Sequence, residues 1–240
     1  MQNNIVARNR FCDITQIKFR KWDEIDAMYW KLTKSNPERK SGEFYSNAYK
    51  DAYVQYNRTL IIESANAFGI PPELLGGVAW IEVGGKPEEF KPIIMNWRAQ
   101  FSSMKNVKPA EHTSVGSVAM QIRVAARTLG LDPETLTTRD QLELASCLLE
   151  DHFNLRLVAQ HLRDVILYDY PDAATLHPTD IQYKMAGIRY NRGIERQRDD
   201  FIRWMEDAMQ KGDHNWPYIS YGERLLLIRP HIKKLLEITW

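Results

Sequence analysis

Glu82 lies on the face of its helix that carries core residues, where an ordinary surface glutamate is not expected. Leu75, Val78 and Glu82 lie at positions i, i+3 and i+7, so the carboxyl group shares a helix face with core side chains. Gly84 and Gly85 follow and end the helix. Burial and the unpaired carbonyls of the last turn both disfavour the charged carboxylate. A protonated carboxyl is what a general acid for cleaving a glycosidic bond needs, whereas the alternative is a helix-end glutamate that reaches solvent.

A second stretch, Gly116 to Ile122, opens a helix after an irregular loop. Gln121, expected one turn into that helix, would present its amide to an N-acetyl or hydroxyl group of a sugar, with Met120 packed beneath it. The alternatives are a packing role for Met120 and a solvated helix face for Gln121.

A third stretch, Met185 to Gly193, ends another helix. Tyr190 would donate a hydrogen bond to the acid or line a saccharide cleft, and Asn191 would fix the loop or contact substrate. The alternatives are a core aromatic side chain for Tyr190 and a helix C-cap for Asn191.

In order and spacing the three stretches resemble the lysozyme-like lytic transglycosylases and goose-type lysozymes. In that family a glutamate follows an apolar helix, a glycine-containing segment ending in Met-Gln comes next, and an Ala-x-Tyr-Asn-x-Gly-like segment completes the site. The resemblance covers residues 69–193, about half of the chain. It implies a muramidase or lytic transglycosylase that cuts the β-1,4 bond between N-acetylmuramic acid and N-acetylglucosamine in peptidoglycan, without a cofactor. It also implies the site residues: Glu82 as the acid, and Gly116, Met120, Gln121, Tyr190 and Asn191 for substrate binding.

The sequence departs from the family pattern next to each motif. Val83 stands where the family often has serine, and Val118-Ala119 stand where it has glycine and leucine. Arg189 and Arg192 replace smaller residues. These departures suggest that the chain resembles a divergent member of that family, and a non-catalytic glycan-binding or structural module with the same fold is an alternative. A hydrolase of chitin or chitosan is another.

The mechanism depends on a second carboxylate. A retaining hydrolase needs a nucleophilic acid about 5 Å from the first, and an inverting one needs a more distant base that holds water. Lytic transglycosylases need neither, because the C6 hydroxyl of the muramyl residue attacks and closes an anhydro ring. Glu88, Glu89 and Glu111 are the acids of the irregular stretch, and Glu111 is the expected second acid because it shortly precedes Gly116. The alternative for these three acids is that they belong to a solvated loop without a role in catalysis.

Apolar residues recur at three and four positions over most of the chain, which predicts an all-α fold with at most a small β excursion. We expect a lysozyme-like helical domain over 69–210, an N-terminal helical segment over 1–68 and a C-terminal helical extension over 211–240. The expected helices cover residues 21–33, 45–68 (one or two helices), a short helix that starts at the two prolines, 71 and 72, and stops at Gly84, and residues 118–129, 138–164, 181–190, 194–209 and 218–240 (one or two helices). Strands are expected only between Gly85 and Ser117.

Composition limits the classes of molecule that the chain is expected to bind. Lys and Arg (32) nearly balance Asp and Glu (31), so nothing suggests the basic surface that dominates nucleic-acid binding. The sequence contains no apolar run of about 18 residues, so it predicts neither a membrane span nor a secretory signal. The expected partner is a peptidoglycan strand, reached in the periplasm by delivery through a secretion machine or from a phage. A secreted antibacterial effector would also imply a cognate immunity protein.

Metal and redox chemistry are not expected. Cys12 and Cys147 are far apart in sequence and lack the spacing of a zinc or Cys-x-x-Cys site, so neither a disulfide framework nor a metal site is indicated. Cys147 is interpreted as a small core residue. His152 and His161 lie nine residues apart, which does not place them on one helix face as a metal pair.

Overall fold

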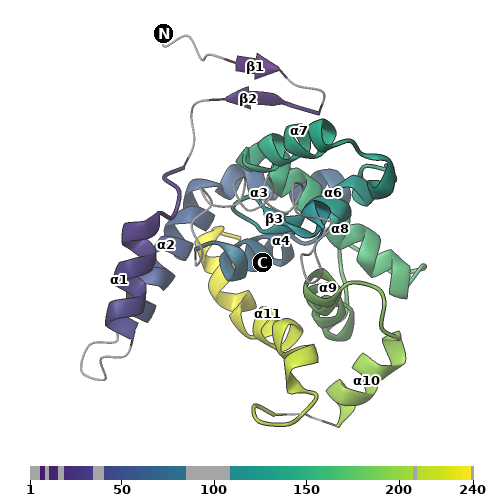
Figure 1. The fold of residues 1–240 in the computed structure, drawn as a ribbon. Helices are drawn as coiled ribbons and strands as arrows, with labels where there is room; N and C mark the ends of the chain where they lie inside the picture. Colours follow the sequence, from purple (N-terminus) through teal and green to yellow (C-terminus); the bar gives the residue numbers. More distant parts are fainter. Residues whose placement is uncertain are drawn as a thin grey trace. The chain divides into compact units, whose positions relative to one another are not determined.

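The computed structural model describes residues 6–8, 11–15, 19–34, 41–84, 109–207 and 210–238, which are mostly helical (Figure 1). The helices are α1 (Glu24–Lys34), α2 (Ser41–Tyr56), α3 (Arg58–Phe68), α4 (Pro72–Glu82), α6 (Ile122–Thr128), α7 (Thr138–Leu148), α8 (Asp151–Asp169), α9 (Asp180–Arg192), α10 (Arg198–Glu206) and α11 (Trp216–Leu235). Two 3-10 turns are η1 (Ala110–His112) and η2 (Pro133–Thr135). The expected mainly helical fold with a small β content is confirmed.

Within the described residues, four short strands form two antiparallel hairpins. Strand β1 (Val6–Arg8) pairs with β2 (Asp13–Thr15), and β3 (Ser114–Val115) pairs with β4 (Met120–Gln121). The expectation of strands only between Gly85 and Ser117 is therefore wrong for three of the four. Strands of two or three residues are too short for alternating hydrophobicity to reveal them.

The chain divides into two compact units. Unit 1 comprises residues 1–56 and 82–157, and unit 2 comprises residues 57–81 and 158–240. The division falls between α2 and α3 and inside α4 and α8. The boundaries expected at residues 68 and 210 stay a prediction. Within the described ranges, no helix is long and apolar enough to cross a membrane.

Glycines let three helices of unit 2 approach closely. A methyl group added to Gly77 of α4 would lie 2.6 Å from Leu225 of α11, and one added to Gly187 of α9 would lie 2.7 Å from the same side chain. On α11 itself, a methyl group added to Gly222 would lie 2.4 Å from the carbonyl oxygen of Lys184, so there is no room for one. Because no such group is present, α11 packs directly on α4 and α9.

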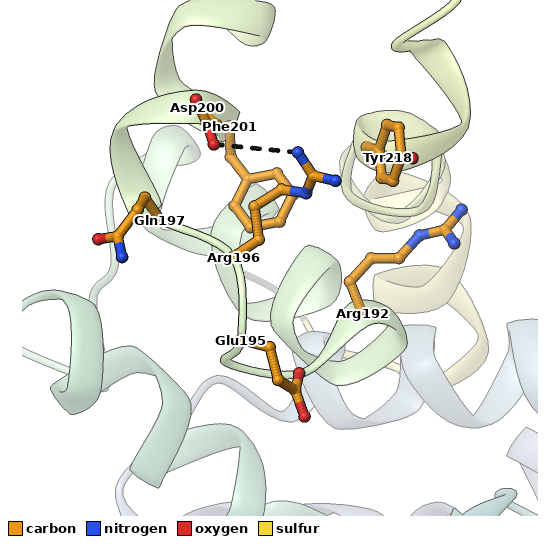
Figure 2. Close-up of a pocket in the computed structure, with 7 residues that line it drawn as sticks. All are labelled: Arg192, Glu195, Arg196, Gln197, Asp200, Phe201 and Tyr218. Atoms are coloured by element: carbon orange, nitrogen blue, oxygen red, sulfur yellow. Dashed lines mark ion pairs between the residues drawn. The ribbon is translucent and has the colours of Figure 1, made fainter.

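The loop between α9 and α10 borders a pocket in unit 2 (Figure 2). A cluster of buried side chains from α9, α10 and α11 packs beside this loop: Met185, Ile188, Phe201, Trp204 and Ile219. Helix α9 starts at Asp180, one residue before the expected 181, and Thr179 caps it in a reciprocal capping box with Gln182.

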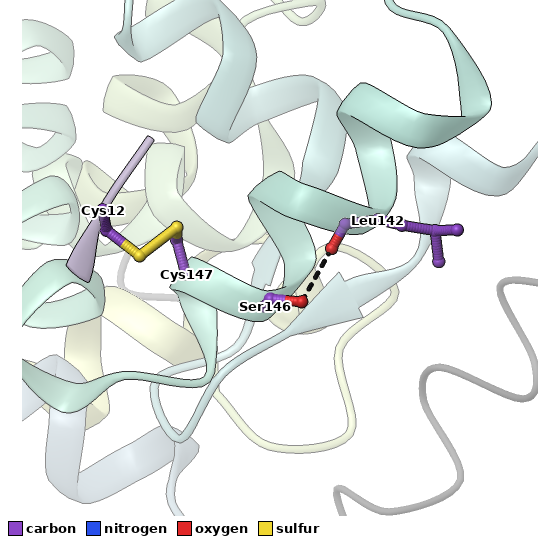
Figure 3. The surroundings of a disulfide bond; sticks show 4 residues. All are labelled: Cys12, Leu142, Ser146 and Cys147. Atoms are coloured by element: carbon purple, nitrogen blue, oxygen red, sulfur yellow. Dashed lines mark hydrogen bonds between the residues drawn. A yellow bond between two sulfur atoms is a disulfide. The ribbon is translucent and has the colours of Figure 1, made fainter. Parts of the chain in front are cut away.

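In unit 1, α1 packs on α2, and a disulfide ties the first hairpin to α7. Cys12, in the connection between β1 and β2, bonds to Cys147, with the Cα atoms 5.8 Å apart although 135 residues separate them (Figure 3). The expectation of unpaired cysteines is therefore wrong. Cys147 is buried as expected, but sequence spacing reports proximity only within one local element.

Several helix boundaries differ from the expected ones. The helix expected at 118–129 begins at Ile122, because residues 116–121 form the turn and second strand of a hairpin. The helix expected at 138–164 is two helices, α7 and α8, which break at Leu149 and Glu150. Apolar periodicity continues across that break and hides it. Helix α11 continues through Pro230, so one helix occupies the stretch where one or two were expected.

Candidate functional site

Glu82 is the last residue of α4. All eight residues from Glu73 to Trp80 are buried, and Glu82 itself is half-buried. The next residue, Val83, is 1% exposed. Gly84 then takes a left-handed φ of 82°, and a methyl group there would lie 3.6 Å from the indole of Trp22. The chain thus leaves α4 through a turn that favours glycine, which confirms the predicted helix end. Gly85, the other expected stop, lies outside the described residues.

An ionic cluster in unit 2 holds the other end of α4. Glu73 Oε1 accepts hydrogen bonds from Arg229 Nε at 3.1 Å and Nη2 at 3.0 Å, and Lys233 Nζ lies 3.6 Å away. Tyr183 donates its hydroxyl hydrogen to the backbone oxygen of Glu73 at 3.0 Å. Burial, reinforced by the charge of Glu73, raises the pKa of Tyr183, which keeps the phenol protonated as a donor. No sequence pattern indicated the pairing of Glu73 with α11.

The turn between β3 and β4 is held by the start of α8. Gly116 has φ 93°, and a methyl group there would lie 2.5 Å from the Leu148 carbonyl oxygen. The buried Asn154 side chain accepts from Val118 N at 2.9 Å and donates to Val118 O at 3.1 Å. This pair of bonds mimics a strand partner and fixes the turn in which Gly116 lies.

Asp151, the first residue of α8, anchors the same turn. Its Oδ1 accepts from Ser117 Oγ at 2.7 Å, Tyr53 OH at 2.9 Å and Lys21 Nζ at 3.1 Å. Lys21 also donates to Ser117 Oγ. The cluster joins three distant parts of unit 1 to the hairpin, and no sequence motif indicated it.

Met120 and Gln121 form β4. Met120 is 2% exposed, which matches its packing role. Gln121 is half-buried and immediately precedes α6, so its expected place one turn into a helix is wrong. Its Oε1 accepts from Arg123 Nε at 2.7 Å, which fixes the amide orientation.

Glu111, the expected second acid, lies half-buried in η1. It belongs to unit 1, as does Glu82. Glu88 and Glu89 lie outside the described residues.

Tyr190 lies in the last turn of α9, in unit 2. It is half-buried, with ring centroids 6.0 Å from His161 and 6.2 Å from Tyr221. Burial lowers the pKa of His161 from 6.5 to about 4, opposed in part by the carboxylate of Asp164. His161 is therefore neutral at pH 7 beside Tyr190.

Asn191 is exposed, and Gly193 rather than Asn191 is the C-cap of α9, so the C-cap interpretation of Asn191 is wrong. Arg189 points inward instead of toward a cleft. It is 1% exposed and forms two hydrogen bonds of 2.7 Å with the Asp169 carboxylate. This departure from the family pattern is therefore a buried structural ion pair.

The predicted site residues fall into both units. Glu82, Glu111 and the hairpin residues Gly116, Met120 and Gln121 belong to unit 1, whereas Tyr190 and Asn191 belong to unit 2. Among the described residues, no group of three or more His, Cys, Asp or Glu side chains could hold a metal ion. Comparisons with protein-family models, with curated proteins and with solved structures find no match to this chain.

Proposed function

We propose that this chain is a peptidoglycan-cleaving glycosidase in which Glu82 donates a proton to the departing sugar oxygen. The observation that supports this most is the place of Glu82: a half-buried glutamate at the last residue of a helix that is buried from Glu73 to Trp80. Loss of hydration and the carbonyl end of the helix both disfavour the anion there, as a general acid requires.

In the proposed reaction the bond between C1 of the muramyl residue and the bridging oxygen breaks, and the proton of Glu82 moves to that oxygen. The resulting carboxylate then takes a proton from the C6 hydroxyl, whose oxygen attacks C1 and closes an anhydro ring. This route needs one carboxyl group. If water attacks instead, Glu111 is the candidate second acid, since it lies half-buried in unit 1 with Glu82.

The β3–β4 hairpin supports the proposal as a rigid platform. Gly116, Asn154 and Asp151 fix its turn through backbone and side-chain contacts. Gln121 follows this turn with its amide already oriented by Arg123. A fixed amide loses little freedom on binding a sugar N-acetyl or hydroxyl group.

The disulfide bears on where the protein would act. Disulfides persist in oxidising compartments such as the bacterial periplasm and are rare in the cytosol. The bond between Cys12 and Cys147 thus favours a working place outside the cytoplasm, where peptidoglycan lies. A delivered antibacterial effector or a phage muramidase fits this location, and an effector would have an immunity protein as a partner.

A non-catalytic glycan-binding module is the second candidate. The contacts of Gln121 with Arg123, and of Tyr190 with His161 and Tyr221, are also what side chains in purely structural roles make. Only an activity measurement separates the two candidates.

The test is digestion of purified peptidoglycan sacculi, with the products identified by mass spectrometry. The wild type should release muropeptides; anhydro ends indicate transglycosylation and reducing ends indicate hydrolysis. The variant Glu82→Gln should release them far more slowly, whereas the control variant Glu63→Gln, which changes an exposed glutamate of α3, should behave as wild type. Binding to sacculi without any product favours the non-catalytic module. Product from chitin or chitosan alone would identify one of those polymers, instead of peptidoglycan, as the substrate.

A further inference from the structure

The disulfide of unit 1 joins two segments that also meet at the candidate site. Cys12 lies in the connection between β1 and β2, and Cys147 lies one residue before the end of α7, where its side chain is fully buried (Figure 3). Strand β2 packs on the same helix. The bond therefore fixes the chain that precedes α1 to the end of α7.

The end of α7 forms part of the surroundings of the β3–β4 turn. The carbonyl oxygen of Leu148, the last residue of α7, lies so close to Gly116 that a methyl group on this glycine would be 2.5 Å from it. Asp151, three residues further along, accepts a hydrogen bond from Ser117 Oγ at 2.7 Å. The residues directly after Cys147 therefore hold the turn of the hairpin.

The chain that precedes α1 contacts the same turn. Lys21 Nζ lies 3.1 Å from Asp151 Oδ1 and also donates to Ser117 Oγ. The next residue, Trp22, is 3% exposed, and a methyl group on Gly84, just after the end of α4, would lie 3.6 Å from its indole. One segment of unit 1 thus contacts both the hairpin and the turn that follows the proposed acid.

The order of this segment depends in part on the disulfide. The side chains of Lys21 and Asp151 are 22% and 11% exposed, so water weakens their ion pair. The bond joins Cys12 and Cys147 across 135 residues of sequence, and breaking it frees the chain before α1 from α7. The remaining contacts must then hold the segment without the covalent link.

We propose that the bond between Cys12 and Cys147 is a redox-sensitive lock that orders the β3–β4 hairpin. Its consequence for catalysis rests on the proposed function. In an oxidising compartment the bond persists, and the locked segment holds both the hairpin and the turn after α4. In the reducing cytosol the bond opens and the hairpin loses order. The lock thus keeps the enzyme weak in the cytosol and strengthens it after delivery.

Opening the lock consumes two molecules of a thiol reductant such as glutathione. A thiolate attacks Cys12 Sγ, because Cys12 is half-buried whereas Cys147 is fully buried; the S–S bond breaks and Cys147 leaves as a thiolate, which takes up a proton. A second thiolate attacks the reductant's sulfur in the mixed disulfide and releases Cys12, which is protonated in turn. The protein gains two electrons and two protons, and the reductant becomes its own disulfide.

The test is hydrogen exchange of the full chain, read by mass spectrometry. It compares the oxidised wild type, the wild type reduced with dithiothreitol, and the double variant Cys12→Ser with Cys147→Ser. Exchange in peptides that cover 114–121 should rise about tenfold or more in both forms that lack the bond. Helix α9 in unit 2 is the internal reference and should change far less.

A second variant separates the contacts from the bond. In oxidised Lys21→Met the disulfide is intact, yet exchange of the hairpin should rise several-fold, because Ser117 and Asp151 lose that partner. The matched control Lys211→Met changes an exposed lysine of unit 2 and should leave the hairpin unchanged.

Release of muropeptides from sacculi is the functional readout. Reduction should lower the rate about tenfold, because the site loses its positioning, and reoxidation should restore the rate. If the oxidised protein releases nothing, the proposed function fails, and the exchange of the hairpin alone still decides whether the lock exists.

Four results would overturn the inference. The first is equal exchange of the hairpin in the oxidised and the reduced protein, and the second is a hairpin that exchanges in Lys21→Met as in wild type. The third is an equal rise in α9 and the hairpin, since it would show a general staple of the fold. The fourth is a reduced protein that cleaves sacculi at the oxidised rate.

Discussion

The buried ion pair between Arg189 and Asp169 offers a sharp prediction about stability. The substitution Asp169→Asn keeps the shape of the side chain and removes its charge. The two hydrogen bonds are 2.7 Å long, and the side chains of Arg189 and Asp169 are 1% and 3% exposed. Water cannot replace the lost partner, so the guanidinium charge stays buried without its counter-ion. Breaking such a pair costs about 3–5 kcal/mol of unfolding free energy.

The assay is urea unfolding of the wild type and the variant, followed by circular dichroism, with hydrogen exchange locating the loss. The matched control is Arg203→Gln, which breaks a 3.0 Å pair with Asp200 in the same unit where the arginine side chain is 64% exposed. That exposed pair should contribute at most about 1 kcal/mol. An Asp169→Asn variant that is destabilised no more than the control would refute the reasoning.

Three further predictions concern single features. The folded pKa of His161, about 4, lies below the ordinary value of 6.5, so the unfolded state binds the proton more tightly. The unfolding free energy should then fall as pH drops from 6.5 to 4, by at most about 3 kcal/mol, and His161→Gln should flatten that part of a urea-derived stability profile. Replacing Cys12 and Cys147 together by serine should lower the unfolding free energy by about 2–4 kcal/mol, because the bond closes a long loop, whereas an unchanged melting curve would contradict this. Gly116→Ala should cost about 2 kcal/mol or more in calorimetry, since its φ is left-handed and the new methyl group meets the Leu148 oxygen; a neutral result would exclude the close contact.

Local chemistry explains what the sequence predicts well. Helix α4 ends at Glu82, where the sequence predicts, because a left-handed Gly84 follows it closely. Helix α9 starts within one residue of the predicted position, because its capping box needs only neighbouring residues. Such signals lie within a few residues of one another, so the sequence carries them in full.

Contacts between distant residues explain what the sequence does not reveal. The disulfide, the pairing of Glu73 with Arg229 and the Asn154 bonds to the hairpin all join residues from separate elements. The side-chain types are visible in the sequence, but their partners depend on how the helices pack.

The candidate site shows the same contrast. The position of Glu82 at a helix end follows from periodicity and is confirmed, together with its partial burial. Gln121 lies in a strand and not in the expected helix. The sequence did not reveal this because a hairpin of such short strands leaves no periodic signal. Arg189 resembles an exposed departure from a motif, yet it is a core residue, because its partner Asp169 lies in another helix.

The most direct test of the central claim is the initial rate of muropeptide release from sacculi by Glu82→Gln relative to wild type. If Glu82 is the general acid, its loss should lower the rate about 100-fold or more while the fold, followed by circular dichroism, stays intact and Glu63→Gln keeps the wild-type rate. A correctly folded Glu82→Gln protein that releases muropeptides at the wild-type rate would contradict the account.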